Sequence, residues 1–264
     1  MNATAGASAW IQSFTRNTKG VDYALGDIHG CYRHLERRLE KVGFNKACDR
    51  LFTAGDLVDR GPENEWVLDW LGQPFFNVCP GNHELFIQKL YRDGEPNEDV
   101  LRKCYEFEKS GFEWWGTTSK FFRREFLSRI KNLPSAIQVD TAIGKVGLIH
   151  ADVPVGYSWD DLPALLALDG EDPLRKKLFS SRDRHTSQDQ TPVAGIDRVF
   201  VGHNVVRKVQ QLGNIINLDT GAYKGRGHRW PGDGGLSIVR IDVSWDELKS
   251  GIEHSKAGKG LLLT

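Results

Sequence analysis

Three stretches in the first third of the chain share one pattern: VDYALGDIHG (21–30), RLFTAGDLVDRG (50–61) and FFNVCPGNHE (75–84). In each, a short apolar run ends at Gly-Asp or, in the third stretch, at Gly-Asn. A buried strand, a glycine that permits a sharp turn and a following helix produce this order of residue types. The repetition predicts a β-α-β-α-β unit, in which parallel strands are covered by helices.

The spacing of apolar residues sets the expected bounds of these elements. Strands are expected at 21–25, 51–54 and 75–79. Leu35, Leu39 and Val42 recur at i, i+4 and i+7, which is the period of one helix face, and a second helix carries Trp66 and Trp70.

The rest of the chain follows a different pattern. Residues 98–132 look helical and aromatic, with Phe122, Phe126 and Ile130 repeating every four residues. The later strands lack regular intervening helices, so they predict a second sheet that is mixed or antiparallel. Strands are expected at 136–140, 145–149, 198–201, 214–218 and 236–242, helices at 160–168 and 174–179, a polar connection at 183–192 and a glycine-rich basic loop at 221–235.

Composition and charge restrict the class of protein. The 264 residues carry 35 basic and 35 acidic side chains, so the formal net charge is zero, which argues against nucleic-acid binding through an overall positive field. The four cysteines form no CxxC pair and suit reduced thiols. No apolar run approaches the roughly 20 residues of a membrane span, and the N-terminus lacks a signal-peptide pattern. We therefore expect a cytoplasmic protein with no membrane or nucleic-acid partner.

Polar side chains follow each strand of the first unit and two strands of the second. They are Asp27, His29, Asp56, Asp59, Asn82 and His83, and then His150 and His203. Ligands of open α/β sheets bind outside the carboxyl ends of the strands, so these side chains should converge at one edge.

The ligand types at that edge suit a metal site. Two carboxylates, one amide oxygen and three imidazoles favour ions such as Mn²⁺, with Fe and Zn²⁺ as alternatives. Six protein ligands are more than one open catalytic ion usually takes, whereas two bridged ions would use them. Asp56 lies on the middle stretch and is the natural bridge.

Each stretch alone also has a structural interpretation. Asp27 could cap a helix after its glycine, a strand-end histidine such as His150 could be a hydrogen-bonded core residue, and Asn82 could be a helix cap. Capping does not require GDxHG, GDxVDRG, GNHE, His-Ala-Asp and Gly-His in this order. The ordered set therefore favours the metal site.

The ordered motifs resemble the metal-dependent phosphoprotein (serine/threonine) phosphatases of the calcineurin-like metallophosphoesterase superfamily. GDIHGCY (26–32), HAD (150–152) and LDTGA (218–222) are similar to its bacterial and bacteriophage lambda-type branch. The resemblance covers about 25–222. It implies a sandwich of two mixed β-sheets flanked by helices, with a dinuclear metal site at the strand carboxyl ends. A single catalytic domain would span 1–264, with an N-terminal extension at 1–20 and a C-terminal tail at about 245–264.

The resemblance also implies a division of roles. Asp27, His29 and Asp56 would bind the first ion, and Asp56, Asn82, His150 and His203 the second. His83 would be the general acid with Asp59 as its partner. Arg60 would grip the phosphate, together with Asn82 and a second arginine. Arg182 is the candidate for that second arginine, with Arg184 as the alternative.

The implied activity is hydrolysis of phosphoserine and phosphothreonine in proteins or peptides, by direct attack of a hydroxide that bridges the ions. A symmetrical dinucleoside tetraphosphate hydrolase is the alternative enzyme, because it looks similar across the same motifs. GDLVDRG with Asp59, and GNHE rather than GNHD, favour the phosphatase. A non-catalytic binding module on the same fold is a second alternative, although every metal position and His83 are present.

Overall fold

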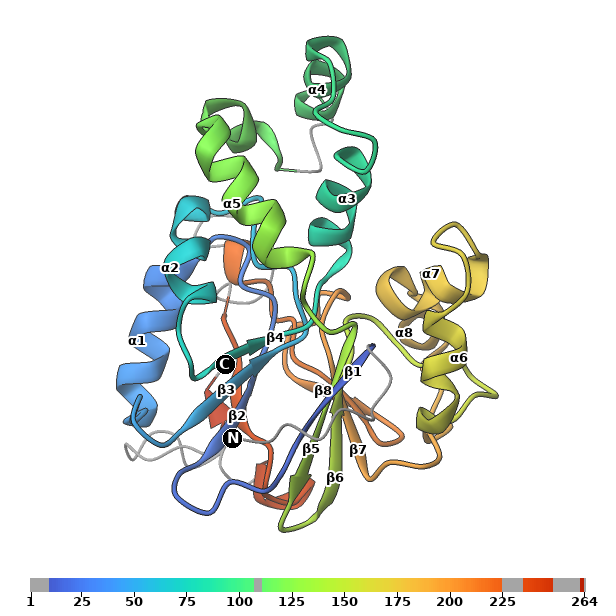
Figure 1. The fold of residues 1–264 in the computed structure, drawn as a ribbon. Helices are drawn as coiled ribbons and strands as arrows, with labels where there is room; N and C mark the ends of the chain where they lie inside the picture. The colour runs from blue at the N-terminus through green and yellow to red at the C-terminus, as the bar shows by residue number, and fades with distance from the viewer. Residues whose placement is uncertain (1–9, 107–110, 225–234, 249–261, 264) are drawn as a thin grey trace.

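Two β-sheets pack face to face and carry helices on their outer faces (Figure 1). The computed structural model describes residues 10–106, 111–224, 235–248 and 262–263. The strands are β1 (Ile11–Phe14), β2 (Asp22–Leu25), β3 (Arg50–Thr53), β4 (Phe76–Val78), β5 (Ala136–Thr141), β6 (Gly144–Leu148), β7 (Arg198–Val201), β8 (Gln210–Leu212), β9 (Ile215–Asn217), β10 (Ile238–Arg240) and β11 (Leu262–Leu263). The α-helices are α1 (Tyr32–Val42), α2 (Val67–Leu71), α3 (Asn82–Leu90), α4 (Glu98–Tyr105), α5 (Lys120–Ile130), α6 (Leu162–Leu166), α7 (Pro173–Ser180) and α8 (Asp183–Ser187), with 3₁₀ turns at Asn64–Trp66, Glu113–Thr117, Trp159–Asp161 and Ala222–Lys224.

Both sheets are mixed, and each contains three neighbouring parallel strands. The strand order is β1-β5-β6-β7-β9-β8 in one sheet and β11-β10-β2-β3-β4 in the other. β2, β3 and β4 run parallel, as do β6, β7 and β9. Antiparallel pairing of β10 with β2, β5 with β6 and β8 with β9 makes the sheets mixed. The predicted α/β class with two mixed sheets is confirmed.

Alternation of side chains along the strands builds the layers. In β2, Tyr23 and Leu25 face the core under α1 and α2, whereas Ala24 faces the core between the two sheets, where Phe52 of β3 also packs. Phe200 of β7 reaches the same central core from the other sheet. A third core lies under α6 and α7. Because side chains point alternately to the two sides of a strand, each sheet can be buried on both faces.

The first predicted unit forms within one or two residues of its expected bounds. Leu35 and Leu39 are buried on α1, and α1 ends at Gly43, whose φ of 68° is the left-handed conformation that glycine adopts without strain. In the aromatic middle region, Phe122, Phe126 and Ile130 are buried on α5 as predicted.

Four elements were missed or assigned differently. β1 lies in the segment interpreted as an extension, yet it pairs in parallel with β5. α8 forms inside the expected polar connection. β8 and the short β11 were not predicted; they pair with β9 and β10. Most of the predicted basic loop, residues 225–234, lies outside the described residues. Within the described ranges, no helix has the length and apolar character needed to span a bilayer.

Candidate active site

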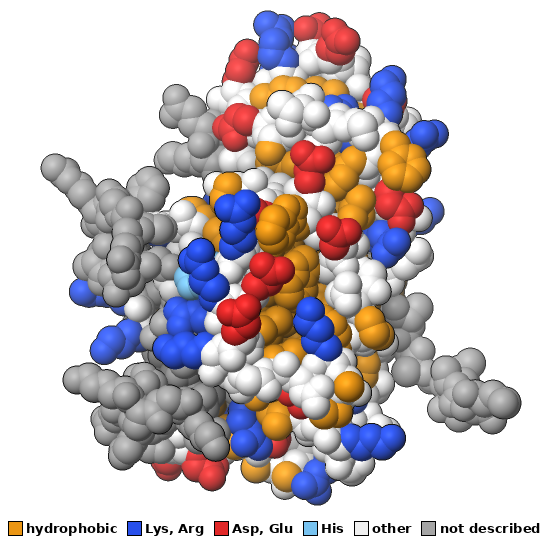
Figure 2. Space-filling model, turned by 90° about the vertical axis from the view of Figure 1, so that its left-hand side faces the viewer, with side chains coloured by type: hydrophobic (Ala, Val, Ile, Leu, Met, Phe, Trp, Pro, Cys, Tyr) orange, Lys and Arg blue, Asp and Glu red, His pale blue; other side chains and the backbone are white. Residues whose placement is uncertain are grey.

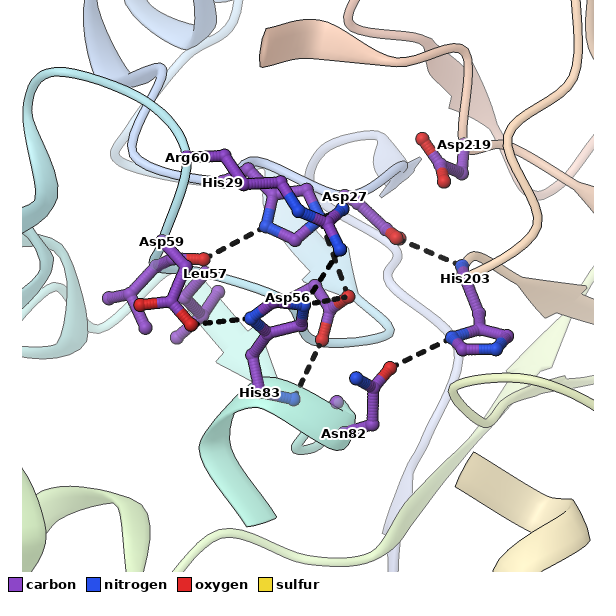
Figure 3. Close-up of polar contacts among 12 residues, drawn as sticks. Asp27, His29, Asp56, Leu57, Asp59, Arg60, Asn82, His83, His203 and Asp219 are labelled. Carbon is purple, nitrogen blue, oxygen red and sulfur yellow. Dashed lines mark hydrogen bonds and ion pairs between the residues drawn. The ribbon is translucent and has the colours of Figure 1, made fainter. Parts of the chain in front are cut away.

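Strand ends of both sheets meet at one edge of the sandwich, where Asp27, Asp56, Asn82, His203 and Asp219 lie close together (Figure 3). The parallel strands β2, β3 and β4 of one sheet each lead into a polar turn, and β6, β7 and β9 of the other sheet do the same. The side chains that follow these strands are, in order, Asp27, Asp56, Asn82, His150, His203 and Asp219. The prediction that strand carboxyl ends would gather the polar residues agrees with this arrangement.

The turns that present these side chains are strained. Among the described residues, six non-glycine residues have positive φ, and five of them lie at this edge. They are His29 (45°), Asp56 (50°), Asp59 (71°), Arg60 (70°) and His203 (67°). Non-glycine residues seldom adopt this conformation, and such strain is concentrated at functional sites.

Two glycines allow the strand-end loops to approach the carboxylates closely. A Cβ on Gly81 would overlap the Asp56 carboxylate, and a Cβ on Gly202 would overlap Asp27. Gly202 belongs to the loop after β7, so it brings the two sheets together at the site. The Gly in each of the GNHE and GH motifs therefore serves close packing.

Glu84 fixes the first sheet's turns to one another, although the sequence did not single it out. Its buried carboxylate accepts hydrogen bonds from the backbone N–H groups of Asp56 (2.9 Å), Leu57 (2.8 Å) and Gly81 (2.8 Å). Burial and the neighbouring Asp56 raise the pKa of Glu84 to about 7. The glutamate of GNHE thus positions the proposed bridging carboxylate.

His150 and Asn82 turn acceptor atoms toward each other. His150 Nδ1 donates to the carbonyl of Ala54 (2.7 Å), which leaves a lone pair on Nε2. That Nε2 lies 2.9 Å from Asn82 Oδ1 and 3.4 Å from Asp56 Oδ1. Burial lowers the pKa of His150, so its imidazole is neutral at pH 7. A cation between these acceptor atoms would stabilise their close approach.

His203 completes this half of the site. Its Nδ1 lies 2.8 Å from Asn82 Oδ1, and burial together with His150 lowers its pKa to about 3. Asp56, His150 and His203 form one group whose ligand atoms lie within 4.8 Å of one another. The predicted ligands of the second ion are therefore gathered in one place.

The predicted ligands of the first ion are only partly gathered. His29 Nδ1 donates to the carbonyl of Val58 (2.9 Å), and its Nε2 lies 3.4 Å from Asp56 Oδ2. The third member within 4.8 Å is His83, not Asp27. Burial would raise the pKa of Asp56, but three neighbouring histidines outweigh burial and lower it. Asp56 belongs to both groups and stays ionised, as a bridging ligand should.

Asp27 lies beside Asp219, a residue to which the sequence assigned no role. The backbone N–H of His203 donates to Asp27 Oδ2 (2.9 Å), whereas Asp27 Oδ1 and Asp219 Oδ2 are buried with no hydrogen-bond partner. Burial raises the pKa of both carboxyls, to about 6 for Asp219. Orphaned buried oxygens next to two groups of metal-ligating atoms fit a site for divalent cations.

His83 is held by a chain of two hydrogen bonds. Its Nδ1 lies 2.5 Å from Asp59 Oδ2, and Trp114 Nε1 donates to Asp59 Oδ1 (2.6 Å). Burial lowers the pKa of His83, but the carboxylates of Asp56 and Asp59 outweigh burial and raise it. Trp114 was interpreted only as an aromatic residue, and its indole fixes the orientation of the carboxylate that orients His83.

The two predicted phosphate arginines adopt different positions. Arg60 points inward and donates to His29 Nε2 (2.7 Å) and His83 Nε2 (3.0 Å), with its guanidinium 4.7 Å from the centre of the Tyr223 ring. It provides positive charge beside these lone pairs. Arg182 donates to Asn204 Oδ1 (3.3 Å) and lines the same cavity as Arg60.

Arg184, the alternative to Arg182, does not reach the site. It is buried, and its Nε donates to Asp152 Oδ1 (2.9 Å), while Nη1 donates to the carbonyl of Thr191 (2.7 Å). Asp152 is the aspartate of the HAD motif. Its carboxylate therefore belongs to a buried ion pair that supports the loop after His150.

A cavity of about 290 Å³ opens over the two ligand groups. Its described lining residues are Asp56, Arg60, Asn82, Arg182, His185, His203, Val205, Tyr223 and Lys224. Two arginines and a lysine around the ligand groups suit an anion of high charge, such as a phosphoryl group. His185 and Lys224 were not predicted as site residues.

Comparisons with known proteins agree with this geometry. The family model for calcineurin-like phosphoesterases matches residues 23–207. The chain is 29% identical over 225 residues to serine/threonine-protein phosphatase 2 of Escherichia coli, covering 83% of this chain and 92% of that protein. It is also 29% identical over 214 residues to the symmetrical bis(5'-nucleosyl)-tetraphosphatase of Legionella pneumophila, covering 77% of this chain and 71% of that protein.

A solved structure extends the likeness to the fold. A protein serine/threonine phosphatase from Saccharomyces cerevisiae superimposes with a TM-score of 0.55 at 16% identity, covering 88% of this chain and 76% of that one. At this identity the likeness concerns the fold alone. This likeness agrees with the two mixed sheets, and the family match shows that the chain belongs to the calcineurin-like phosphoesterase family and is a hydrolase of that superfamily.

Proposed function

We propose that this chain is a metal-dependent phosphomonoesterase that acts on phosphoserine and phosphothreonine in proteins. One observation supports it above the others: the Trp114–Asp59–His83 chain sets an imidazole of raised pKa beside two ligand groups that share Asp56. An alkoxide leaving from phosphoserine needs a proton, and a positioned general acid provides one.

The ligand groups are suited to two divalent ions, for which we propose Mn²⁺. His29, Asp27 and Asp56 would bind one ion, and Asp56, Asn82, His150 and His203 the other. When bound, two such ions neutralise phosphoryl charge and lower the pKa of water to near 7. The neutral imidazoles of His150 and His203 need no deprotonation at pH 7, which favours binding.

The chain's own residues do the rest. Arg60 donates to His83 Nε2 in this structure, so this nitrogen would gain its proton when Arg60 turns toward the substrate, and Asp59 would stabilise the charged imidazole. Arg60, in the turn after β3, and Arg182, between α7 and α8, line the cavity and would contact the phosphoryl oxygens. For Arg60 this requires its guanidinium to turn from the histidines toward the substrate.

The rival activity is symmetrical hydrolysis of dinucleoside tetraphosphates, which the name of one relative carries. The phosphatase is supported by the greater share of the relative that the chain covers, 92% against 71%. A general acid also matters more for an alkoxide than for a phosphate leaving group, which is a weaker base.

A panel of substrates tests the proposal. The Mn²⁺-loaded protein is given phosphoserine and phosphotyrosine peptides and diadenosine tetraphosphate, and kcat/KM is measured for each. We expect the phosphoserine peptide to be hydrolysed with the highest kcat/KM. Turnover of the dinucleotide alone would replace the proposal with the rival activity, and turnover of none would favour a non-catalytic module.

We also propose that the protein works in the cytoplasm. The four cysteines are free thiols, and Cys31 and Cys79 are buried. Free thiols suit a reducing compartment. Localisation of a tagged chain by fractionation checks this, and recovery outside the cytoplasmic fraction would contradict it.

A further inference from the structure

Residues of α3 and α7 line a groove of about 750 Å³. Both helices lie on the side of the molecule away from α1 (Figure 1). The groove begins at Asn82, which belongs to the candidate active site, and follows α3 to Arg92 in the turn beyond it. The end of α5 forms its third wall, through Leu127 and the following Lys131. We call this the α3–α7 groove.

The α3–α7 groove is strongly basic. Its basic lining residues are Lys89, Arg92, Lys131, Arg175 and Lys176. Glu171 is the one acidic residue among its described lining residues. Because the whole chain has a formal charge of zero, this excess is local. By contrast, Figure 2 shows acidic and basic side chains together on the face that carries α1.

One carboxylate already connects the two walls. Lys89 Nζ of α3 lies 2.6 Å from Glu171 Oε1, and Lys176 Nζ of α7 lies 2.8 Å from Glu171 Oε2. These two lysines lower the pKa of Glu171 to about 2. The spacing of the walls therefore suits a carboxylate between them.

Other basic groups of the groove have no such partner. Arg92 and Lys131 are exposed, and neither forms an ion pair with any residue that the structure describes. Arg175 Nε is buried without a hydrogen-bond acceptor, while its guanidinium lies 5.7 Å from the centre of the Trp10 ring. Positive charge thus remains available along the groove.

The groove also offers apolar surface between its charges. Phe86 of α3 is 40% exposed, and Leu85, Leu127 and Phe179 line the same walls. This mixture suits a polypeptide, whose backbone and methylene groups cover apolar surface while carboxylates meet lysine and arginine. A dinucleoside tetraphosphate carries its negative charge on its phosphates alone. Its uncharged nucleosides would not pair with the basic groups of the groove that lie farthest from Asn82.

We infer that the α3–α7 groove binds an acidic segment of the phosphoprotein substrate, next to the phosphorylated residue. This inference rests on the proposed function. From Asn82 to Leu90 the helix rises about 12 Å at 1.5 Å per residue. An extended peptide covers that length with about four residues at 3.3–3.6 Å each. Carboxylates within about four positions of the phosphoserine should therefore be recognised.

Peptide kinetics test the inference. Three phosphoserine peptides carry acidic, neutral or basic residues within four positions of the phosphoserine, and kcat/KM is measured with the Mn²⁺-loaded protein at low and high salt. We expect the acidic peptide to exceed the neutral one by about tenfold at low salt, with the basic peptide lowest. At about 0.5 M salt the preference should shrink, because exposed charges are screened.

A double variant tests the residues. Arg92→Gln with Lys131→Gln should lower kcat/KM for the acidic peptide by about threefold to tenfold. Hydrolysis of p-nitrophenyl phosphate, which has no peptide flank, should be unchanged. Arg37→Gln with Lys41→Gln on α1 removes the same charge from exposed positions outside the groove and should leave every peptide unaffected.

The outcomes separate the inference from the proposed function. Equal hydrolysis of all three peptides, or equal losses in both double variants, would overturn the inference and leave the phosphatase intact. Hydrolysis of diadenosine tetraphosphate but no peptide would overturn both. If the groove variant instead lowered only dinucleotide turnover, the groove would bind a nucleotide and the inference would be wrong.

Discussion

The two sheets contribute to the candidate active site in different ways. The half built by β2, β3 and β4, which we call the first half, presents four strained non-glycine residues and includes His83, Asp59 and Arg60. The second half, built by β6, β7 and β9, presents His150, His203 and Asp219, of which only His203 has positive φ. The first half thus combines proposed ligands with the proposed general acid, whereas the second half presents proposed ligands.

The halves are also supported differently. In the first half, the ionisable Glu84 binds three backbone N–H groups. In the second half, the neutral Asn217 connects two turns: its amide donates to the carbonyl of Asn204 (2.7 Å), and its Oδ1 accepts from the N–H of Asp219 (2.9 Å). We therefore expect precise positioning to matter most in the first half, where the proposed general acid lies.

Asp56 is shared by both ligand groups, so its loss should have the largest effect. We expect Asp56→Asn to abolish activity and to lower the occupancy of both ions, because one carboxylate balances charge in both groups. Asn82→Ala, which removes a neutral oxygen, should mainly weaken the second ion. Metal content measured on both purified variants decides this. Two ions retained at full occupancy in Asp56→Asn would disprove the bridge.

Substitutions of His83 in the first half and His150 in the second half should have different effects on metal content and on kcat. His83→Asn should keep both ions and lower kcat on phosphoserine by about 10²–10⁴-fold, with a smaller loss on p-nitrophenyl phosphate, whose leaving group needs less protonation. His150→Asn should lose an ion and affect both substrates alike. Kinetics and metal analysis of the same preparations check this. Equal losses on both esters in His83→Asn would remove the general-acid role.

Substitutions of the two arginines Arg182 and Arg184 in the second half should change the stability of the protein by different amounts. Arg184→Ala leaves Asp152 buried and unpaired, so the free energy of unfolding should fall by about 3–5 kcal/mol. Arg182→Ala should leave stability nearly unchanged and raise KM, because its side chain lines the cavity. Urea unfolding and steady-state kinetics measure both quantities. A stable Arg184→Ala with raised KM would exchange the two roles.

Glu84 and Asn217 support the turns of the two halves, and their substitutions should differ least in effect. Glu84→Gln keeps the size of the side chain but can offer only one carbonyl oxygen to three N–H groups, so we expect a loss of about 1–3 kcal/mol in the free energy of unfolding. Asn217→Ala should cost an amount in the same range but reduce activity less, because it supports no proton-transfer group. Urea unfolding of both variants measures the losses. A larger effect of Asn217→Ala on kcat would reverse the comparison.

Much of the first half could be predicted from the sequence. There the strand, glycine turn and helix follow one another locally, so periodicity located β2, β3, β4 and α1 closely. The same local order placed the polar turn residues at the strand ends. Glu84 was visible in GNHE, but two of its three carboxylate contacts come from residues 27 and 28 positions away, which periodicity does not reveal.

The rest depends on contacts between distant residues. β1 pairs with β5 through Ile11 and Ala136, and no local pattern indicates such a partner. Trp114 reaches Asp59 across 55 positions. Asp219 was noted within a motif, but its place beside Asp27 depends on how the two sheets pack. These three contacts depend on long-range packing, so they could not be predicted from local sequence patterns.

Mn²⁺ titration of the metal-free protein, followed by electron paramagnetic resonance, measures whether the two halves bind two ions that share Asp56. We expect two Mn²⁺ per chain with a spin-coupled spectrum, and loss of the coupling in Asp56→Asn. A single Mn²⁺ per chain, or two with independent spectra, would contradict it.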